Sequence, residues 1–408
     1  MPTDVKPRPL EIINFKNKLL EQYEHILSEK EKIKALEDPH AFRSPRWCGI
    51  TVHVAINCPY NCIYCYIEDM GFKHSKPIPY PLSGKELIYA LLKNPAFLPG
   101  KTGTLIAIGS VSEPFSLPNK ALEFIEELSK LGNPIQFSTK SYITPSLANK
   151  LATIDNENPS SINPLITVIT IEKSNILEPL APSPEKRFDS IKNLRDAGLK
   201  PVLFLRPIIP GVNDNEILDV LKKAKEAGAY GVVFGSFRIT ERILRKLENV
   251  GLNTALIKQR VKKIDYRQRA INLPEKEKFI QLAKNIGLIP WKSACCANSW
   301  NAQVPCASAC FIDGPTTRCP NLCAFPKNSA DKNELAKALD LLGIKARIKG
   351  PYVKILNYPH AGVEFLVRTL GRYATILPKH VKRERIKVLK STTKIFTRLN
   401  NHDKGQQA

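Results

Sequence analysis

Three cysteines within eight residues, Cys58, Cys62 and Cys65, have the types and spacing best suited to chemistry in this sequence. They lie in the stretch CPYNCIYC, which follows a short apolar run over 50–56. Three thiols this close cannot all pair as disulfides, so the spacing indicates metal ligands. Structural zinc takes four protein ligands, and a cubane iron–sulfur cluster has four irons to ligate. Because the next cysteine after Cys65 is Cys295, the spacing predicts a cluster with one iron open to another ligand. A zinc knuckle is the alternative interpretation.

A second group of six cysteines lies within thirty residues near the carboxyl-terminal third of the chain. Its members are Cys295, Cys296, Cys306, Cys310, Cys319 and Cys323. In a cytosolic chain, such a group indicates metal ligands more readily than disulfides. Two interpretations stay open: an auxiliary iron–sulfur cluster, and a structural zinc site that uses four of the six thiolates.

Composition and length limit the class of protein. The 408 residues suffice for one barrel-sized domain and a smaller one. Lys and Arg number 61 against 38 Asp and Glu, a net charge of +23 that favours anionic partners. A thermophile-like composition is the alternative explanation, since the chain has only two Met. No apolar run reaches the roughly 18 residues that span a bilayer, and the amino terminus has no signal-peptide core. We therefore expect a cytoplasmic protein with no membrane partner.

The segments that must position the first cysteine group alternate between two patterns. From Gly49 onward, short β-branched runs alternate with amphipathic helix patterns, which is typical of parallel βα units. The expected strands are 50–56, 104–108, 135–138, 165–171, 201–205 and 231–234. Six such units predict the α/β class and a partial (β/α)6 TIM-like barrel. In barrels the functional face is formed by the carboxyl ends of the strands.

Polar and glycine residues follow these expected strand ends. They are Gly109, Ser110 and Glu113 after the second strand, Ser138 and Lys140 after the third, Glu172 after the fourth, Arg206 after the fifth and Gly235 after the sixth. Polar groups are costly to bury unpaired, so at the mouth of a barrel they are expected to face a ligand or one another. Arg187 lies near the start of the helix after the fourth strand. Its planar guanidinium group is suited to binding a carboxylate through two parallel hydrogen bonds. A solvent-facing Arg187 is the alternative.

The cysteine motif resembles the signature of the radical S-adenosylmethionine (SAM) superfamily, including Tyr64 immediately before the third cysteine. Four further segments, GSVSEP, STKS, LEPLAPSPEKR and LRPIIPGVND, occur in order at successive strand ends. They resemble the group related to spore photoproduct lyase, often labelled DNA repair photolyase-like, over residues 49–238. The resemblance implies a 4Fe-4S cluster whose open iron binds SAM, and reductive cleavage of SAM to methionine and a 5′-deoxyadenosyl radical.

The resemblance also implies roles for individual residues. Cys58, Cys62 and Cys65 are expected to be the catalytic cluster ligands, and the other named residues to surround SAM. Of these, the resemblance places the glycine-rich segment with Gly109, Ser110 and Glu113 at the SAM amino group and Arg187 at the carboxylate. From their positions at the strand ends, Glu172 is expected at the ribose and Gly235 at the adenine. Tyr64, Ser138, Lys140 and Arg206 are expected beside them. The electron donor is expected to be a protein such as ferredoxin or flavodoxin.

One position departs from the lyase pattern. Spore photoproduct lyases use a cysteine as hydrogen donor near the second strand end, where this chain has Ser110 and Ser112. Because a serine O–H is a poor hydrogen-atom donor, we do not expect reversal of the spore photoproduct.

The carboxyl-terminal segment is strongly basic. From residue 327 onward there are 18 Lys and Arg against 6 Asp and Glu, a balance of +12. Its pattern predicts a small α+β unit followed by a basic helix or arm over 379–394. We expect Lys345, Arg347, Lys349 and Lys354 to lie along its strands, with Tyr352 and Tyr358 available to stack on bases, which predicts nucleic-acid binding. A solvated basic face is the alternative.

These observations predict four segments. They are a helical extension over 1–48, a radical SAM partial barrel over 49–288, a cysteine-rich metal segment over 289–326 and a basic domain over 327–408. The predicted function is SAM-dependent radical chemistry on an unknown substrate, with nucleic acid (tRNA or DNA) preferred. A peptide or small-molecule substrate is one alternative, and a non-catalytic, zinc-stabilised nucleic-acid-binding protein is the other.

Overall fold

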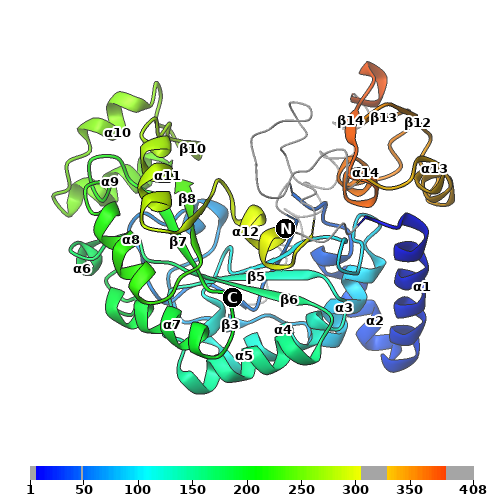
Figure 1. Cartoon of the computed structure of the whole chain (residues 1–408), viewed down its shortest axis with the longest axis horizontal. Helices are drawn as coiled ribbons and strands as arrows, with labels where there is room; N and C mark the ends of the chain where they lie inside the picture. Colours follow the sequence, from blue (N-terminus) through cyan, green and yellow to red (C-terminus); the bar gives the residue numbers. More distant parts are fainter. Residues whose placement is uncertain (1–5, 47–48, 305–328, 383–408) are drawn as a thin grey trace, which may run out of the picture.

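A parallel sheet of seven strands forms the centre of the computed structural model, which describes residues 6–46, 49–304 and 329–382 (Figure 1). In spatial order the strands are β1 (Ile50–Val52), β4 (Ile106–Ile108), β5 (Pro134–Thr139), β6 (Ser161–Ile166), β7 (Val202–Ile208), β8 (Gly231–Ser236) and β11 (Ile289–Trp291). All adjacent strands in this order are parallel. The sheet is the partial barrel that the alternating pattern predicted.

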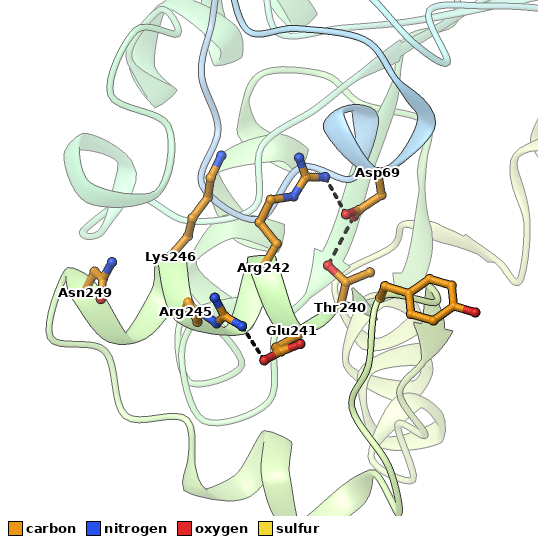
Figure 2. Close-up of a pocket in the computed structure, with 8 residues that line it drawn as sticks. Asp69, Thr240, Glu241, Arg242, Arg245, Lys246 and Asn249 are labelled. Atoms are coloured by element: carbon orange, nitrogen blue, oxygen red, sulfur yellow. Dashed lines mark hydrogen bonds and ion pairs between the residues drawn. The ribbon is translucent and has the colours of Figure 1, made fainter.

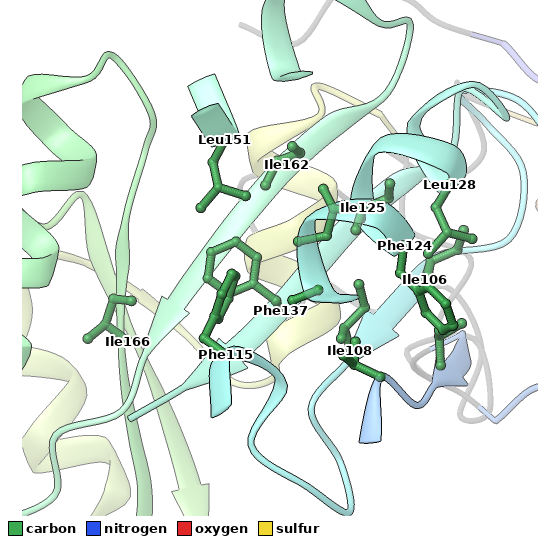
Figure 3. Close-up of a cluster of buried hydrophobic side chains, with 14 of the residues drawn as sticks. Ile106, Ile108, Phe115, Phe124, Ile125, Leu128, Phe137, Leu151, Ile162 and Ile166 are labelled. Atoms are coloured by element: carbon green, nitrogen blue, oxygen red, sulfur yellow. The ribbon is translucent and has the colours of Figure 1, made fainter. Parts of the chain in front are cut away.

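Six helices cover one face of this sheet and build the main hydrophobic core with it. They are α3 (Gly84–Lys93), α4 (Pro118–Ser129), α5 (Pro145–Glu157), α7 (Pro184–Asp196), α8 (Ile217–Glu226) and α11 (Lys276–Asn285). Alternate strand residues, such as Ile106, Ile108 and Phe137, point into this core, as Figure 3 shows. Because successive side chains of a strand point to opposite faces, the intervening residues line the concave side of the barrel.

The helices begin where the sequence offers a capping group. Ser83 and Glu86 form a capping box at the start of α3. Thr144 and Ser183 each accept a backbone N–H at the start of α5 and α7, and each is followed by proline at the first helical position. These side chains satisfy N–H groups that have no partner within the helix, so they fix where each helix begins.

The seventh strand, β11, lies beyond residue 288 and was not among the six expected strands. It pairs with β8, and Gly231 of β8 makes room for it, because a Cβ there would lie 2.3 Å from Trp291 Cζ3. The next helix, α12 (Ala294–Asn301), packs on the concave side against β5 and β6 (Figure 1). A strand of three residues is too short to show the alternation of apolar and polar residues by which strands are recognised in a sequence. It forms because it pairs with β8 and is buried there.

The amino-terminal segment, expected to be helical, forms two helices, α1 (Pro9–Ile26) and α2 (Glu29–Glu37). The break lies at Leu27, which is extended, and Ser28, which forms a capping box with Glu31. The carboxyl-terminal half of α1 packs on the main core through Leu19 and Tyr23. Its amino-terminal half packs on a second core, so α1 joins the two.

That second core belongs to a carboxyl-terminal α+β unit, drawn in orange near α1 in Figure 1. It contains α13 (Lys332–Leu341), β12 (Ala346–Lys349), β13 (Tyr352–Ile355), α14 (Val363–Gly371) and β14 (Ala374–Ile376). β12 and β13 are antiparallel, and β14 runs parallel to β13. Arg372 Nη2 donates a hydrogen bond of 2.6 Å to the carbonyl oxygen of Thr102, which fastens the unit to the barrel.

The remaining elements are short and lie in the connections. They are β2 (Ala55–Ile56), β3 (Ile78–Pro79), α6 (Ser174–Leu177), β9 (Arg238–Ile239), α9 (Glu241–Asn249), α10 (Ala255–Arg260), β10 (Arg269–Ala270) and the 3₁₀ turns Pro39–Ala41, Ile67–Met70 and Pro114–Ser116. None of the helices within the described residues has the length and apolarity needed to cross a membrane.

Removing the side chain of Trp291 tests the seventh strand. Trp291 is 2% exposed, so Trp291→Ala should lower the free energy of unfolding by about 3–5 kcal/mol, measured by denaturant titration. Tyr266, which is 74% exposed, provides the control. Tyr266→Ala should change the free energy of unfolding by no more than about 0.5 kcal/mol. Equal effects of the two changes would contradict the burial of β11.

Candidate active site

The cysteine motif forms a loop directly after β2. Asn57 and Asn61, which precede Cys58 and Cys62, have φ angles of 69° and 47°. Asparagine adopts this left-handed conformation more readily than most residues, so it allows the two sharp turns. The Cys58 N–H donates to the carbonyl oxygen of Lys73, and the Cys65 N–H to that of Cys62. The local sequence therefore dictates the compact shape of the loop.

Three tyrosines fasten this loop to the ends of three strands. The hydroxyls of Tyr60 and Ser141 lie 2.7 Å apart beyond β5. The Tyr64 hydroxyl donates to Glu178, which follows β6, and the Tyr66 hydroxyl donates to the Ser110 carbonyl, which follows β4. The tyrosines thus attach the loop to the carboxyl ends of the central strands.

Glu178 and Arg187 form a buried ion pair beneath the loop, and both side chains are fully inaccessible to solvent. Arg187 also donates to the carbonyl oxygens of Thr167 (3.1 Å) and Pro182 (2.8 Å). Its remaining nitrogen, Nη2, is buried without a hydrogen-bond partner. Arg187 was expected at the SAM carboxylate, and the structure places its guanidinium on Glu178, where it holds the cysteine loop through Tyr64.

The electrostatics around the thiols depend on burial and on one cation. Burial raises the pKa of Cys58 to about 11 and raises the pKa of Cys62 and Cys65 above their usual value. Burial lowers the pKa of Lys140, but the neighbouring Cys62 and Glu178 raise it, and its net pKa lies above the ordinary value. Lys140 Nζ lies 3.8 Å from Glu178 and 5.6 Å from the centre of the Tyr64 ring. A charged Lys140 would stabilise the thiolates that a metal centre requires.

The ends of β4 and β5 meet beside the loop. Gly109 has a φ of 95°, and a Cβ there would lie 2.5 Å from the Ser138 carbonyl oxygen, so only glycine fits. Ser138 Oγ donates to the Gly109 carbonyl. Glu113 is buried and accepts hydrogen bonds from the Lys140 N–H and the Thr139 hydroxyl. Burial raises the pKa of Glu113 above its usual range. These groups join two strand ends at the loop.

Two further expected residues lie together on the concave side. The Arg206 side chain of β7 passes over Gly235 of β8, because a Cβ at Gly235 would lie 2.3 Å from Arg206 Cγ. Arg206 is also near Tyr66. Glu172 is different: its side chain is exposed, while its N–H donates to Glu216. The structure thus gathers most of the expected residues at the loop and leaves the Glu172 side chain outside that network.

Two cysteines of the second group lie at a distance from this loop. Cys295 and Cys296 are buried on α12, in a cluster with Leu105 and Val202 at the starts of β4 and β7. This is the opposite end of the sheet from Cys58. The other four, Cys306, Cys310, Cys319 and Cys323, lie outside the described residues.

Among the described residues, no group of three His, Cys, Asp or Glu side chains is arranged to bind a single metal ion. The donor set at the loop nevertheless fits an iron–sulfur cluster. Cys58, Cys62 and Cys65 form no disulfide, and cysteine thiolates are the ligands that such clusters use. Each thiolate binds a different iron of a cubane, so the three sulfurs need not converge on one point.

An open pocket of about 450 Å³ lies beside the same loop, over helix α9 (Figure 2). Arg242 pairs with Asp69, which also accepts a hydrogen bond of 3.2 Å from the Thr240 hydroxyl, and Arg245 pairs with Glu241. Asp69 lies four residues after Cys65, so these contacts tie α9 to the cysteine loop.

Sequence reasoning assigned no role to Glu178, Tyr60, Tyr66 or Glu216. Glu216 is 3% exposed and accepts hydrogen bonds from Thr170, Ile171, Glu172 and Lys173, which closes the turn after β6. The tyrosines that alternate with the cysteines were a usable signal. Glu216 gave none, because its partners are distant in sequence. Glu178 lies in the segment LEPLAPSPEKR, but its contact with Tyr64 joins residues that are far apart in the chain.

A model of a known family matches part of the chain. Residues 52–224 match the model of the radical SAM superfamily, a region that contains the cysteine loop and strands β4 to β7. Residues 52–224 are therefore similar to radical SAM proteins, and they contain the part of the sheet that carries the cysteine loop.

The individual relatives are distant. An uncharacterized protein of Methanocaldococcus jannaschii is 29% identical over 195 residues, which cover 46% of this chain and 70% of that protein. An uncharacterized protein of Mycobacterium bovis is 26% identical over 196 residues, covering 45% of this chain and 58% of that protein, less than two thirds of its length.

Solved structures found in the comparison include a spore photoproduct lyase mutant, with 15% identity, a TM-score of 0.47 and coverage of 61% of this chain and 78% of that one. A radical SAM methyltransferase from Sphaerobacter thermophilus has 14% identity, a TM-score of 0.40 and coverage of 59% and 65%. Similarities this low carry no inference about substrate.

The buried ion pair gives a test of how the loop is held. Arg187→Met removes the cation in direct contact with the buried Glu178 and leaves only Lys140, whose Nζ lies 3.8 Å away, so it should lower the free energy of unfolding by about 3–5 kcal/mol in denaturant titration. Lys192 pairs with Asp196 on the surface, where both side chains are more than 60% exposed. The matched change Lys192→Met should lower the free energy of unfolding by about 1 kcal/mol or less. A cost for Arg187→Met no larger than this control would contradict the role given to the pair.

Proposed function

We propose that this protein is a radical SAM enzyme that binds a 4Fe-4S cluster through Cys58, Cys62 and Cys65 and acts on nucleic acid. The observation that carries the enzymatic part is the position of the three thiols. They lie on one loop, fastened to the carboxyl ends of the central strands, within the region matched by the superfamily model. When bound, the cluster would supply the electron that cleaves SAM reductively to a 5′-deoxyadenosyl radical.

The chain's own residues would bind and orient the cofactor. Lys140 would favour thiolates over thiols at the loop, and the ion pair of Glu178 and Arg187 would keep the loop fixed through Tyr64. Gly109, Ser110, Ser138, Arg206 and Gly235 line the strand ends beside the loop and remain our candidates for contacting SAM. Glu113 and Arg187 are already engaged by protein groups, so we assign them the positioning of those contacts. Electrons would come from a protein such as ferredoxin or flavodoxin.

Reconstitution tests the cluster. After anaerobic incubation with iron and sulfide, Cys58→Ala should contain about four fewer irons per chain than the wild type, because a cubane cluster needs all three thiolates. Ser112→Ala, which removes no thiol from the neighbouring strand end, should keep the iron. With dithionite and SAM, only the wild type and the control should release 5′-deoxyadenosine. A colourless protein that contains only zinc would contradict the proposal.

The substrate class rests on the carboxyl-terminal sheet. Arg347 lies opposite Lys354, and Lys349 lies opposite Tyr352, in the pairing of β12 with β13. All four side chains are exposed, whereas Val353 and Ile355, which alternate with Tyr352 and Lys354 along β13, are buried in the second core. One face of this sheet therefore presents three cations and an aromatic ring. Such a face suits a single-stranded nucleic acid, whose phosphates bind cations and whose bases stack on rings.

Tyr358 does not contribute to this face. It was expected to stack on bases, but it is 7% exposed and its hydroxyl donates to the Ala361 carbonyl. That expectation is wrong, because the ring packs in the second core. The basic arm expected over 379–394 lies mostly outside the described residues.

Neutralising the sheet face tests the substrate class. The triple variant Arg347→Gln, Lys349→Gln, Lys354→Gln should weaken binding to single-stranded RNA or DNA and make the slope of log K against log salt shallower by about 2, because three phosphate contacts are lost. The control triple Lys150→Gln, Lys192→Gln, Lys222→Gln removes the same charge from exposed positions on the barrel helices. If both triples change the slope equally, net charge accounts for the binding and the sheet face has no special role.

A further inference from the structure

The concave side of the barrel contains a pair of amide side chains that the proposed SAM site does not use. Gln136 of β5 and Asn163 of β6 are direct partners in the parallel pairing of these strands. Their neighbours Phe137 and Ile162 point into the helix-covered core, as Figure 3 shows. Because side chains alternate along a strand, Gln136 and Asn163 point to the concave side, next to each other.

Both amides are buried without the hydrogen bonds that burial normally demands. Asn163 is 0% exposed, and neither its Oδ1 nor its Nδ2 has a partner. Gln136 is 8% exposed, and its Oε1 has no partner. Nearly all buried polar groups in folded proteins are hydrogen-bonded, because an unpaired buried amide is costly. The pair therefore indicates a ligand with polar groups of its own.

The surroundings of the pair are polar but uncharged on one side and apolar on the other. Helix α12 crosses beside it, since Asn298 donates to the carbonyl oxygen of Pro134 and Asn301 to that of Ile162. Asn298 Oδ1 and Ser299 Oγ are also buried without partners. Leu165, Val202 and Phe204 line the same concave face, and Phe204 is partly exposed. A ligand here would be neutral, with donors and acceptors on its edge and apolar faces.

We propose that Gln136 and Asn163 form a subsite for the hydrogen-bonding edge of a single unpaired nucleobase. An asparagine or glutamine amide presents one donor and one acceptor side by side, which matches the edge of a base, and the apolar wall matches its flat face. Enzymes that modify a base take it out of the stack and bind it within the protein, where hydrogen bonds to its edge recognise it. The subsite rests on the nucleic-acid function proposed above and extends it to the base itself.

The stability of the unliganded protein gives the first test. Asn163→Leu removes an amide that makes no hydrogen bond, so the melting temperature should stay the same or rise. Asn133 is the matched control: it is also 0% exposed, but its Nδ2 donates to the carbonyl oxygens of Leu98 and Thr104, so Asn133→Leu should lower the melting temperature by several degrees. If Asn163→Leu lowers it as much as the control, the amide has a structural role and the subsite is rejected.

Binding to oligonucleotides gives the second test. The probes are single strands of about ten nucleotides, DNA and RNA, with a central adenine, cytosine, guanine, thymine or uracil, or with a central abasic site. The full-length wild type should bind at least one base-containing strand about 10-fold more tightly than the abasic strand. Asn163→Leu and Gln136→Leu should bind both strands as weakly as the wild type binds the abasic one.

The remaining outcomes separate the two proposals. A wild type that binds base-containing and abasic strands equally contradicts the subsite and leaves the nucleic-acid function standing. Base discrimination that survives in both leucine variants also contradicts the subsite, because another part of the chain then reads the base. A wild type that binds no strand rejects the nucleic-acid function and, with it, the subsite.

Discussion

The carboxylate of Glu178 is the group on which the arrangement of the site depends. It binds the Tyr64 hydroxyl from the cysteine loop above and the Arg187 guanidinium below, and neither charged side chain reaches solvent. A buried carboxylate is stable only with such partners, so the contact that neutralises Glu178 also fixes the loop. Through Glu178, the loop between Cys62 and Cys65 is held against Arg187 of helix α7.

The two faces of the central sheet have different chemistry, and this difference defines the site. The face toward the helices is filled by apolar side chains such as Ile106, Phe137 and Ile166 (Figure 3). The concave face carries Ser138, Arg206 and an amide pair, and α12 covers the part near the strand starts. Stability thus comes mainly from one face, which leaves the other free to retain polar groups that burial alone would disfavour.

The carboxyl-terminal unit is joined to the barrel through α1 as well as by direct contacts. Ile12 and Ile13 of α1 belong to the core of this unit, whereas Leu19 and Tyr23 of the same helix belong to the core of the barrel. A single rigid helix that is shared by two cores restrains their relative position. The carboxyl-terminal unit, with its basic sheet face, is thereby held in a fixed position relative to the barrel.

The sequence by itself determined the features that depend on residues close together in the chain. The spacing of Cys58, Cys62 and Cys65, the alternation of strands with capped helices, and the hairpin of β12 and β13 all follow from local patterns. Only the tertiary structure decided the contact of Tyr64 with Glu178, the burial of Tyr358, the seventh strand and the juxtaposition of Gln136 with Asn163. These depend on contacts between distant segments, and the free energy of burying a charge or an amide is set by such contacts and not by the neighbouring residues.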